Sequence, residues 1–180
     1  MIRLAGVPAT AGVPTRIVLG SFSVESRVGL HEVVRAARAG DPEAVADILD
    51  RVRRAAPAIW PEVTAAIVVP VPGHLPGPPH PWLVAVSEAI ASARGWHLAF
   101  DALRRTSPAP EGKTGHSRDP GSEAATLRWH LPALGAMIVL VDDVIRTGAT
   151  IGACAEALRV AGDERTVVAI ALARAEPARG

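Results

Sequence analysis

The chain is poor in cysteine, lysine and aromatic residues, and each shortage excludes a class of protein. Cys154 is the only cysteine in 180 residues, which excludes an internal disulfide and a cysteine-rich zinc site. Tyrosine is absent and aromatic residues make up 3% of the chain, a composition that disfavours stacking on single-stranded nucleic acid. Lys113 is the only lysine and the formal net charge is +1, so no strong field attracts nucleic acid or anionic membranes.

Long apolar runs are missing as well. The opening stretch MIRLAGVPATAGVPTR is interrupted by Pro8 and Pro14 and lacks the continuous apolar core of a signal peptide. No later run is long enough to cross a bilayer. We therefore expect a cytoplasmic protein that binds neither membranes nor nucleic acid directly. Its length suits a single domain over residues 1–180.

Apolar segments alternate along the chain with segments of helical spacing. The first 15 residues are expected to be loose or to form an edge. Strands are expected at 16–22, 64–73, 96–105, 135–143 and 165–174, and helices at 26–40, 41–56, 81–94 and 147–162. Asp41 and Pro42 are typical of an N-cap and a first helical turn. Strands separated by helices predict an α/β domain with a mainly parallel sheet, whose ligands collect beyond the carboxyl ends of the strands.

The segment 107–128 differs from the rest of the chain. It is rich in glycine, proline, serine and charged residues and has almost no apolar periodicity. A loop of this length in a compact domain is usually functional or disordered. The GKT at residues 112–114 lacks the first glycine and the preceding strand of a triphosphate-binding loop, which disfavours a nucleoside-triphosphatase.

The most informative stretch is VLVDDVIRTGAT, residues 139–150. An apolar strand runs into Asp142 and Asp143, which should point to solvent at the strand end. Because adjacent carboxylates repel each other, the two aspartates need a positive group or hydrogen-bond donors nearby. The turn at 147–150 opens a helix whose first N–H groups lack partners, and Gly148 allows a close approach, so this turn suits a phosphate. Carboxylates beside it can accept from sugar hydroxyls or help hold Mg²⁺. A ribose with a 5-phosphate satisfies both halves.

This stretch resembles the phosphoribosyl-pyrophosphate-binding motif of type I phosphoribosyltransferases, in which an apolar strand, two acidic residues and a Thr/Gly phosphate loop follow one another. Together with GSFSVESRVGLHEVVRAARAGD, IVVPVP and VVAIALARA, it resembles the competence protein F (ComF) branch, here lacking the N-terminal zinc module. The resemblance implies a type I phosphoribosyltransferase fold: a central, mainly parallel sheet flanked by helices, with a flexible loop over the active site.

The resemblance also implies roles for individual residues. Asp142 and Asp143 would face the ribose 2- and 3-hydroxyls and serve as ligands of Mg²⁺, the expected cofactor. The loop 107–128 would supply Lys113 and Arg118 as catalytic residues that neutralise departing pyrophosphate. The 5-phosphate would be wrapped by Arg146, Thr147, Gly148, Ala149 and Thr150, and the pyrophosphate would meet Pro72, Gly73 and His74. Arg146 stands where relatives usually carry threonine, and we expect it to contact ligand phosphate.

The implied activity is transfer of phosphoribose to a nitrogen acceptor with release of pyrophosphate. The transition state would be oxocarbenium-like and would need no protein nucleophile. The partners are phosphoribosyl pyrophosphate and an unidentified acceptor, and a homodimer is compatible with the resemblance. The alternative is a protein without turnover: a sensor of this metabolite or an accessory protein of DNA uptake.

Several other residues have ordinary structural explanations. His74, His80 and His116 lack metal-ligand spacing and are expected at the surface, although His74 is also a candidate pyrophosphate contact. Cys154 is expected in the core, on the inner face of its helix. Trp129 is expected to pack rather than to stack on a base, and Arg104 and Arg105 are expected to be charges at a strand end.

Overall fold

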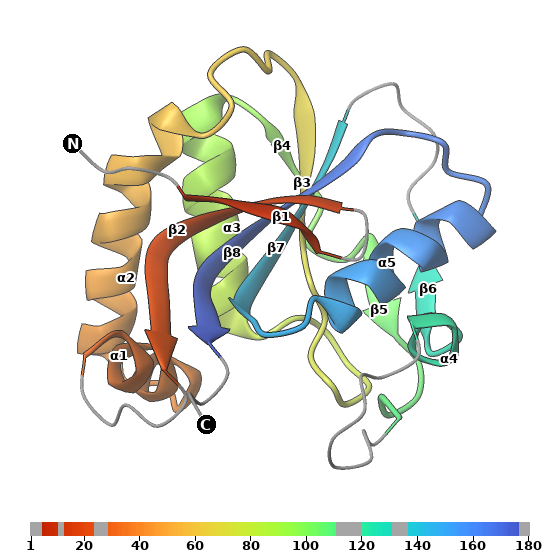
Figure 1. The fold of residues 1–180 in the computed structure, drawn as a ribbon, viewed down its shortest axis with the longest axis horizontal. Coiled ribbons are helices and arrows are strands. Elements are labelled where there is room, and N and C mark those ends of the chain that lie inside the picture. Colours follow the sequence, from red (N-terminus) through yellow and green to blue (C-terminus); the bar gives the residue numbers. More distant parts are fainter. Residues whose placement is uncertain (1–4, 11–12, 24–28, 111–119, 131–136, 177–180) are drawn as a thin grey trace.

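The computed structural model describes residues 5–10, 13–23, 29–110, 120–130 and 137–176. Its main sheet has six strands in the order β1-β2-β8-β7-β3-β4 (Figure 1). The first strand, β1, pairs antiparallel with β2 at one edge, and the remaining neighbours are parallel. The strands span Ala5–Thr10 (β1), Val13–Ser23 (β2), Ala66–Pro70 (β3), His97–Leu98 (β4), Met137–Ile145 (β7) and Val167–Glu176 (β8). The predicted α/β class and mainly parallel sheet are confirmed.

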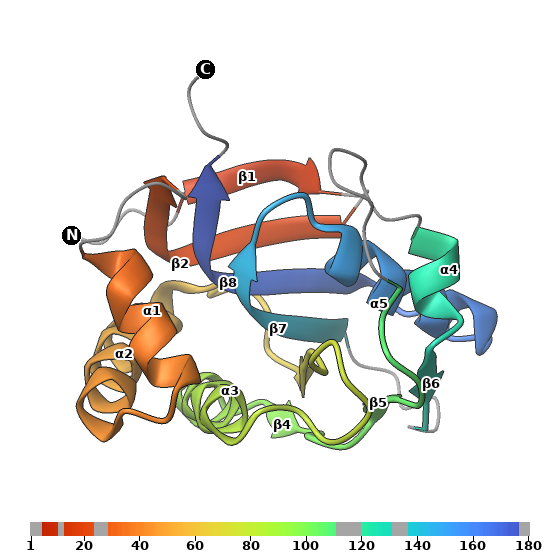
Figure 2. The same cartoon turned by 90° about the horizontal axis from the view of Figure 1, so that it is seen from below.

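Helices cover both faces of this sheet (Figures 1 and 2). One face packs against α1 (Leu30–Arg38), α2 (Pro42–Ala55) and α3 (Pro81–Arg94), and the short 3₁₀ helix η1 (Ala56–Ala58) lies between α2 and the turn to β3. The other face packs against α5 (Ala149–Val160). Beside α5 lie α4 (Pro120–Ala124) and a separate antiparallel pair, β5 (Leu103–Arg105) with β6 (Leu127–Trp129).

The apolar runs of β3 and β7 follow from burial on both faces. Val68 and Val139 belong to the core cluster beneath α1, α2 and α3, whereas Ile67 and Ile138 belong to the cluster beneath α5. Because successive side chains of a strand point to opposite faces, a strand covered on both sides needs an unbroken apolar sequence. Cys154 is buried in the second cluster, as expected, and its burial raises the pKa of the thiol.

Most predicted elements are confirmed, with shifted ends. The Asp41 side chain caps α2, since its Oδ1 accepts a hydrogen bond from the Glu43 N–H at 2.9 Å, and Pro42 occupies the first turn. Within the opening segment, residues 5–10 form the edge strand β1. The segment 96–105, predicted as one strand, forms two short strands, β4 and β5, in different sheets. The strand β7 continues to Ile145, so Asp142 and Asp143 lie inside the strand rather than after it.

The prediction that the whole segment 107–128 is a loop was wrong at its C-terminal end. Residues 120–124 form α4, and β6 begins at Leu127. Leu127 and Ala124 are buried in the core cluster beneath α5, and Thr126 donates from its hydroxyl to the Glu123 carbonyl oxygen at 2.7 Å. Burial of these few side chains orders a stretch that has no apolar periodicity.

None of the helices in the described ranges is long and apolar enough to span a bilayer. The cytoplasmic location and the single-domain boundary at 1–180 remain predictions.

Candidate functional site

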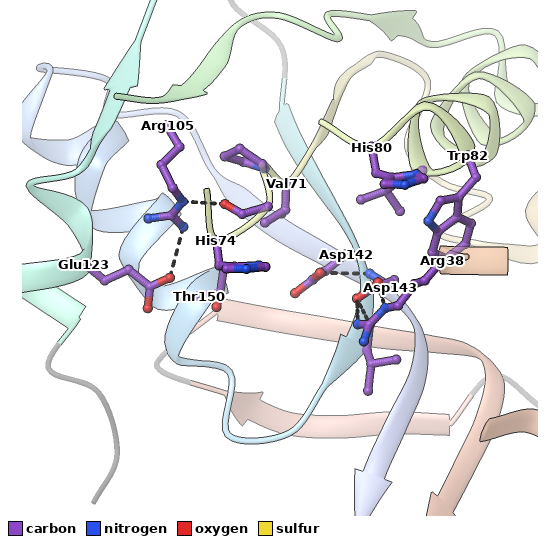
Figure 3. Close-up of a pocket in the computed structure, with 14 residues that line it drawn as sticks. Arg38, Val71, His74, His80, Trp82, Arg105, Glu123, Asp142, Asp143 and Thr150 are labelled. Atoms are coloured by element: carbon purple, nitrogen blue, oxygen red, sulfur yellow. Dashed lines mark hydrogen bonds and ion pairs between the residues drawn. The ribbon is translucent and has the colours of Figure 1, made fainter. Parts of the chain in front are cut away.

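A cavity of about 380 Å³ lies at the carboxyl ends of β3 and β7 (Figure 3). Residues from the N-terminal helix α1 and residues from the C-terminal half of the chain line it together. Its lining consists of Arg38, Val71, Pro72, Gly73, His74, His80, Trp82, Leu83, Arg105, Glu123, Asp142, Asp143, Val144 and Thr150. Six of these, Pro72, Gly73, His74, Asp142, Asp143 and Thr150, were predicted from the sequence.

Unequal strand lengths create the cavity. The last residue pair between β3 and β7 joins Pro70 to Val141, whereas β7 continues beside β8 as far as Ile145. Asp142 therefore lies just beyond the end of β3, where β7 has lost its neighbour on that side. Ligand sites at the carboxyl ends of parallel strands are the general expectation for such sheets.

The positive group that the acidic pair requires is Arg38, at the end of α1. Its Nε donates to Asp143 Oδ2 at 2.5 Å and its Nη2 donates to Asp143 Oδ1 at 2.6 Å, which makes the ion pair bidentate (Figure 3). The hydrogen bond with Asp143 raises the pKa of Arg38. The expectation that both carboxylates simply face solvent was therefore wrong for Asp143, whose side chain is 17% exposed.

Asp142 has no such counter-ion of its own. Its Oδ1 accepts a hydrogen bond from the Asp143 N–H at 2.8 Å, and its Oδ2 accepts none from the described residues. Burial, reinforced by the charge of Asp143, raises the pKa of Asp142 to about 8. The protonated form of this carboxyl is therefore favoured to a higher pH than in an ordinary aspartate, and Oδ2 keeps free hydrogen-bonding capacity toward the cavity.

The turn between β7 and α5 places a glycine at the start of the helix, where the sequence predicted it. Gly148 is the N-cap of α5 and adopts φ +79°, a left-handed conformation that side chains other than glycine rarely accept. Thr147 Oγ1 accepts a hydrogen bond from the Ala149 N–H at 3.3 Å. Thr150 lines the cavity, whereas Arg146, Thr147, Gly148 and Ala149 are not among its lining residues; Arg146 is exposed.

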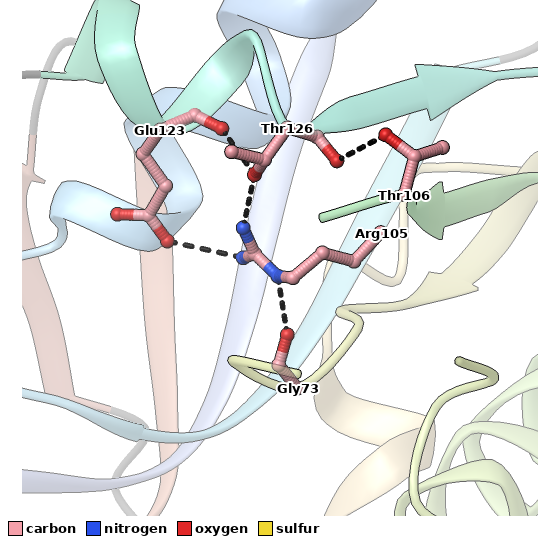
Figure 4. Close-up of polar contacts among 5 residues, drawn as sticks. All are labelled: Gly73, Arg105, Thr106, Glu123 and Thr126. Carbon is pink, nitrogen blue, oxygen red and sulfur yellow. Dashed lines mark hydrogen bonds and ion pairs between the residues drawn. The ribbon is translucent and has the colours of Figure 1, made fainter. Parts of the chain in front are cut away.

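A buried polar network fixes the other end of the cavity (Figure 4). Arg105 donates through Nη2 to Glu123 Oε1 at 3.1 Å, and both side chains are 1% exposed. The same guanidinium donates through Nε to the Gly73 carbonyl oxygen and through Nη1 to Thr126 Oγ1. One buried arginine thus ties the loop after β3 to α4 and to the turn that precedes β6.

Sequence reasoning missed Arg38, Arg105 and Glu123 as site residues. Arg105 does end the strand β5, as expected, but it is buried and paired with Glu123 rather than being a simple strand-end charge. The pattern Leu103-Arg104-Arg105 contained a usable signal, because residues two apart in a strand share a face and Leu103 is fully buried. Arg38 and Glu123 had no comparable local signal. The predicted catalytic residues Lys113 and Arg118, and His116, lie outside the described residues.

Trp129, His74 and His80 behave as predicted. Trp129 packs against the core cluster beneath α5, and its Nε1 donates to Asp163 Oδ2 at 2.9 Å. His74 and His80 are exposed, and both line the cavity.

The predicted Mg²⁺ ligands were Asp142 and Asp143. Within the part of the chain that the structure describes, no three or more His, Cys, Asp or Glu side chains are grouped so that they could hold a metal ion. Arg38 already engages both oxygens of Asp143, and burial favours the protonated form of Asp142. The two residues by themselves therefore do not fit a Mg²⁺ site held by protein ligands alone.

Comparisons with known proteins give matches only among solved structures. No family model matches the sequence, and no curated protein does. Adenine phosphoribosyltransferases from Leishmania tarentolae and Leishmania donovani are similar to the chain at 15% and 16% sequence identity. The first match covers 77% of this chain and 74% of the other with a TM-score of 0.37; the second covers 77% and 68% with a TM-score of 0.36. At these values we take nothing about this chain's activity from the two neighbours.

Proposed function

We propose that this chain has the type I phosphoribosyltransferase fold and that the cavity binds phosphoribosyl pyrophosphate, with transfer of phosphoribose to a nitrogen acceptor. One observation carries the proposal. The acidic pair of β7, the first helical turn of α5 and the loop after β3 come from separate segments, and residues of all three line one cavity at the carboxyl edge of the sheet.

The geometry suggests a place for each part of the ligand. The turn before α5 offers a left-handed glycine and a helix N-terminus to the 5-phosphate. Asp142 Oδ2 is free to accept a hydrogen bond from a ribose hydroxyl. Gly73 and His74 also line the cavity, and we propose that the pyrophosphate lies against them. Because Asp142 and Asp143 do not form a metal site alone, we propose that Mg²⁺ arrives bound to the phosphates of the ligand.

Turnover would then require only positioning and charge stabilisation. A nitrogen lone pair would form the bond to the anomeric carbon as the carbon–oxygen bond breaks, and pyrophosphate would leave with the bonding electron pair. The alternative function, a sensor or a DNA-uptake accessory without turnover, is favoured by one observation. Arg38 belongs to α1 and holds Asp143, so a ligand at Asp143 would act directly on an element outside the sheet.

The binding proposal predicts loss of affinity when the acidic pair is neutralised. Calorimetry with phosphoribosyl pyrophosphate and MgCl₂ should show binding to the parent chain. At pH 9, where Asp142 is ionised, the double variant Asp142→Asn/Asp143→Asn should bind at least about tenfold more weakly, since the hydrogen bond from a ribose hydroxyl to the Asp142 carboxylate, worth ~1.5–3 kcal/mol, is weakened. The control Asp47→Asn/Asp50→Asn removes two exposed carboxylates of α2 and should bind like the parent. Unchanged affinity of the Asp142→Asn/Asp143→Asn variant would reject the ribose assignment. A separate assay of pyrophosphate release would distinguish an enzyme from a sensor without turnover.

Arg38 should also influence affinity, although it was not predicted as a site residue. Arg38→Gln leaves the charge of Asp143 uncompensated beside Asp142, and the added negative charge repels a ligand that carries phosphates. We expect binding about tenfold weaker at low salt, or ~1.4 kcal/mol, with a smaller difference at high salt. Arg35→Gln, exposed on the same helix, is the matched control. Tighter binding by Arg38→Gln would show instead that the ion pair competes with the ligand.

Arg146 gives a further test of the phosphate turn. Its side chain is exposed and no hydrogen bond or ion pair joins it to the described residues, so it is available to a ligand phosphate. Arg146→Thr should weaken binding by about 1–3 kcal/mol, the scale of a hydrogen bond to a charged group, and the loss should shrink as salt is raised. Arg54→Thr on α2 provides a matched exposed control. Equal affinities of Arg146→Thr and the parent at low salt would exclude the contact.

A further inference from the structure

A second cavity, of about 480 Å³, lies among α4, β6 and α5 and shares no described residue with the first (Figure 1). The helix α4 contributes to both, because Glu123 lines the first cavity and its neighbour Ala124 lines the second. A volume of this size is typical of small-molecule sites, which span roughly 300–1,000 Å³. The proposed function makes no use of this second cavity.

Small residues of the two helices produce the hollow, since side chains with one carbon or none leave space between packed elements. They are Gly121, Ala124, Ala125, Ala157 and Ala161. Larger apolar side chains complete the wall. Val160 is 71% exposed, and Trp129 is half-buried. The Trp129 Nε1 already donates to Asp163 Oδ2 at 2.9 Å, so this side chain offers a ligand apolar surface only.

Two charged residues line the second cavity, and one of them is already neutralised. Glu156 accepts from Arg159 Nε at 2.8 Å and from Arg159 Nη2 at 2.6 Å. This bidentate ion pair occupies both carboxylate oxygens of Glu156. The negative charge at the cavity is therefore balanced within the chain.

The other charged residue, Arg128, is exposed and forms no ion pair with the described residues. Its Nη1 donates to the carbonyl oxygens of Ala125 at 3.1 Å and Leu127 at 2.9 Å, which hold the guanidinium against the turn between α4 and β6. Its Nε and Nη2 have no partner among the described residues. Arg128 also lies directly opposite Arg104 in the β5–β6 pair, where like charges repel each other. An anion at Arg128 would relieve this repulsion.

The free edge of Arg128 has the geometry of a carboxylate receptor. The Nε and Nη2 hydrogens of an arginine point the same way and match the two oxygens of a carboxylate. Arg38 holds Asp143 by this edge, and Arg159 holds Glu156 by it. We infer that the second cavity binds a small carboxylate with an apolar body: the body lies against the alanines, Trp129 and Val160, and the carboxylate accepts from Arg128.

The probes 2-naphthoate and 2-naphthamide test this inference, because they share a rigid apolar ring system and differ in the charge of the substituent. Each is titrated into the parent chain and followed by amide chemical shifts. At low salt 2-naphthoate should bind at least about tenfold more tightly, with a smaller difference at high salt. It should shift the amide signals of Ala125, Leu127 and Ala161. Equal affinities at low salt, no saturable binding of 2-naphthoate, or shifts at Gly73 and Thr150 instead would overturn the site.

Two variants at exposed positions then separate the charge from the hollow. Arg128→Gln should lower the affinity for 2-naphthoate to that for 2-naphthamide, whereas Arg54→Gln, exposed on α2, should keep the preference. Ala125→Leu fills part of the hollow and should weaken both probes, whereas Ala93→Leu, exposed on α3, should bind them like the parent.

An Arg128→Gln variant that still prefers 2-naphthoate, or an Ala125→Leu variant with the parent's affinities, would overturn the assignment. The comparison of the two probes on the parent chain needs no variant and does not depend on variant folding. Neither probe contains phosphate or sugar, and the two cavities have separate linings. Phosphoribosyl-pyrophosphate binding can therefore fail while this site stands, and the reverse.

Discussion

Arg105→Met should lower the free energy of unfolding by about 3–5 kcal/mol, measured by urea denaturation. The substitution leaves the Glu123 carboxylate buried without its counter-ion and removes the donors to Gly73 and Thr126. Removing one member of a buried ion pair is costly because the remaining charge stays out of water. A loss below 1 kcal/mol would mean that Glu123 is reached by solvent or becomes neutral at little cost.

Two companion variants separate the ion pair from general packing. The Arg105→Met/Glu123→Met variant removes both charges and should recover most of the lost stability, since apolar side chains of similar volume often replace buried ion pairs without penalty. Arg104→Met changes an arginine on the same strand whose side chain is 57% exposed, and it should change stability by less than about 1 kcal/mol. Recovery in the double variant together with a neutral Arg104→Met would assign the effect to the pair.

The fold was predictable because each helix and strand is indicated by residues that lie close together in the sequence. A short β-branched run such as residues 66–70 shows that both faces of a strand are covered, and Asp41-Pro42 marks a helix start without reference to the rest of the chain. The acidic pair and the turn around Gly148 are also contiguous in sequence. Local patterns therefore predicted both the sheet and the position of the turn around Gly148.

The polar partners were not predictable in the same way, because the residues that pair are far apart in sequence. Arg38 and Asp143 are separated by 105 positions, and Arg105 and Glu123 by 18 positions, with Glu123 in the segment 107–128 that has almost no apolar periodicity. Charge alone does not identify partners, since most arginines are solvated and only the folded sheet brings these four together. The sequence indicated that the acidic pair needed a positive group; the tertiary packing of α1 supplied it.

This packing also makes Asp142 a residue whose contributions to stability and to function oppose each other. Its pKa in the folded chain is about 8, whereas an aspartate in an unfolded chain titrates near its ordinary value of about 3.8. Between these values the folded state binds a proton that the unfolded state has released, so this residue makes stability fall as the pH rises from about 4 to about 8. Above pH 8 the buried charge exerts its full cost.

Asp142→Asn should remove that cost while keeping the oxygen that accepts from the Asp143 N–H. At pH 9 we expect the variant to melt at least about 2–4 °C above the parent, the shift that ~1 kcal/mol produces in a domain of this size. At pH 4 the two melting temperatures should converge, because the parent carboxyl is then protonated in the folded state.

The same variant should bind phosphoribosyl pyrophosphate more weakly than the parent at pH 9, since an amide is a poorer acceptor than a carboxylate for a ribose hydroxyl. A melting difference that does not change between pH 4 and pH 9 would show that Asp142 is solvated and has an ordinary pKa. A stabilised variant with lowered affinity would show that the chain keeps a half-buried, destabilising carboxyl for its ligand, as functional sites commonly do.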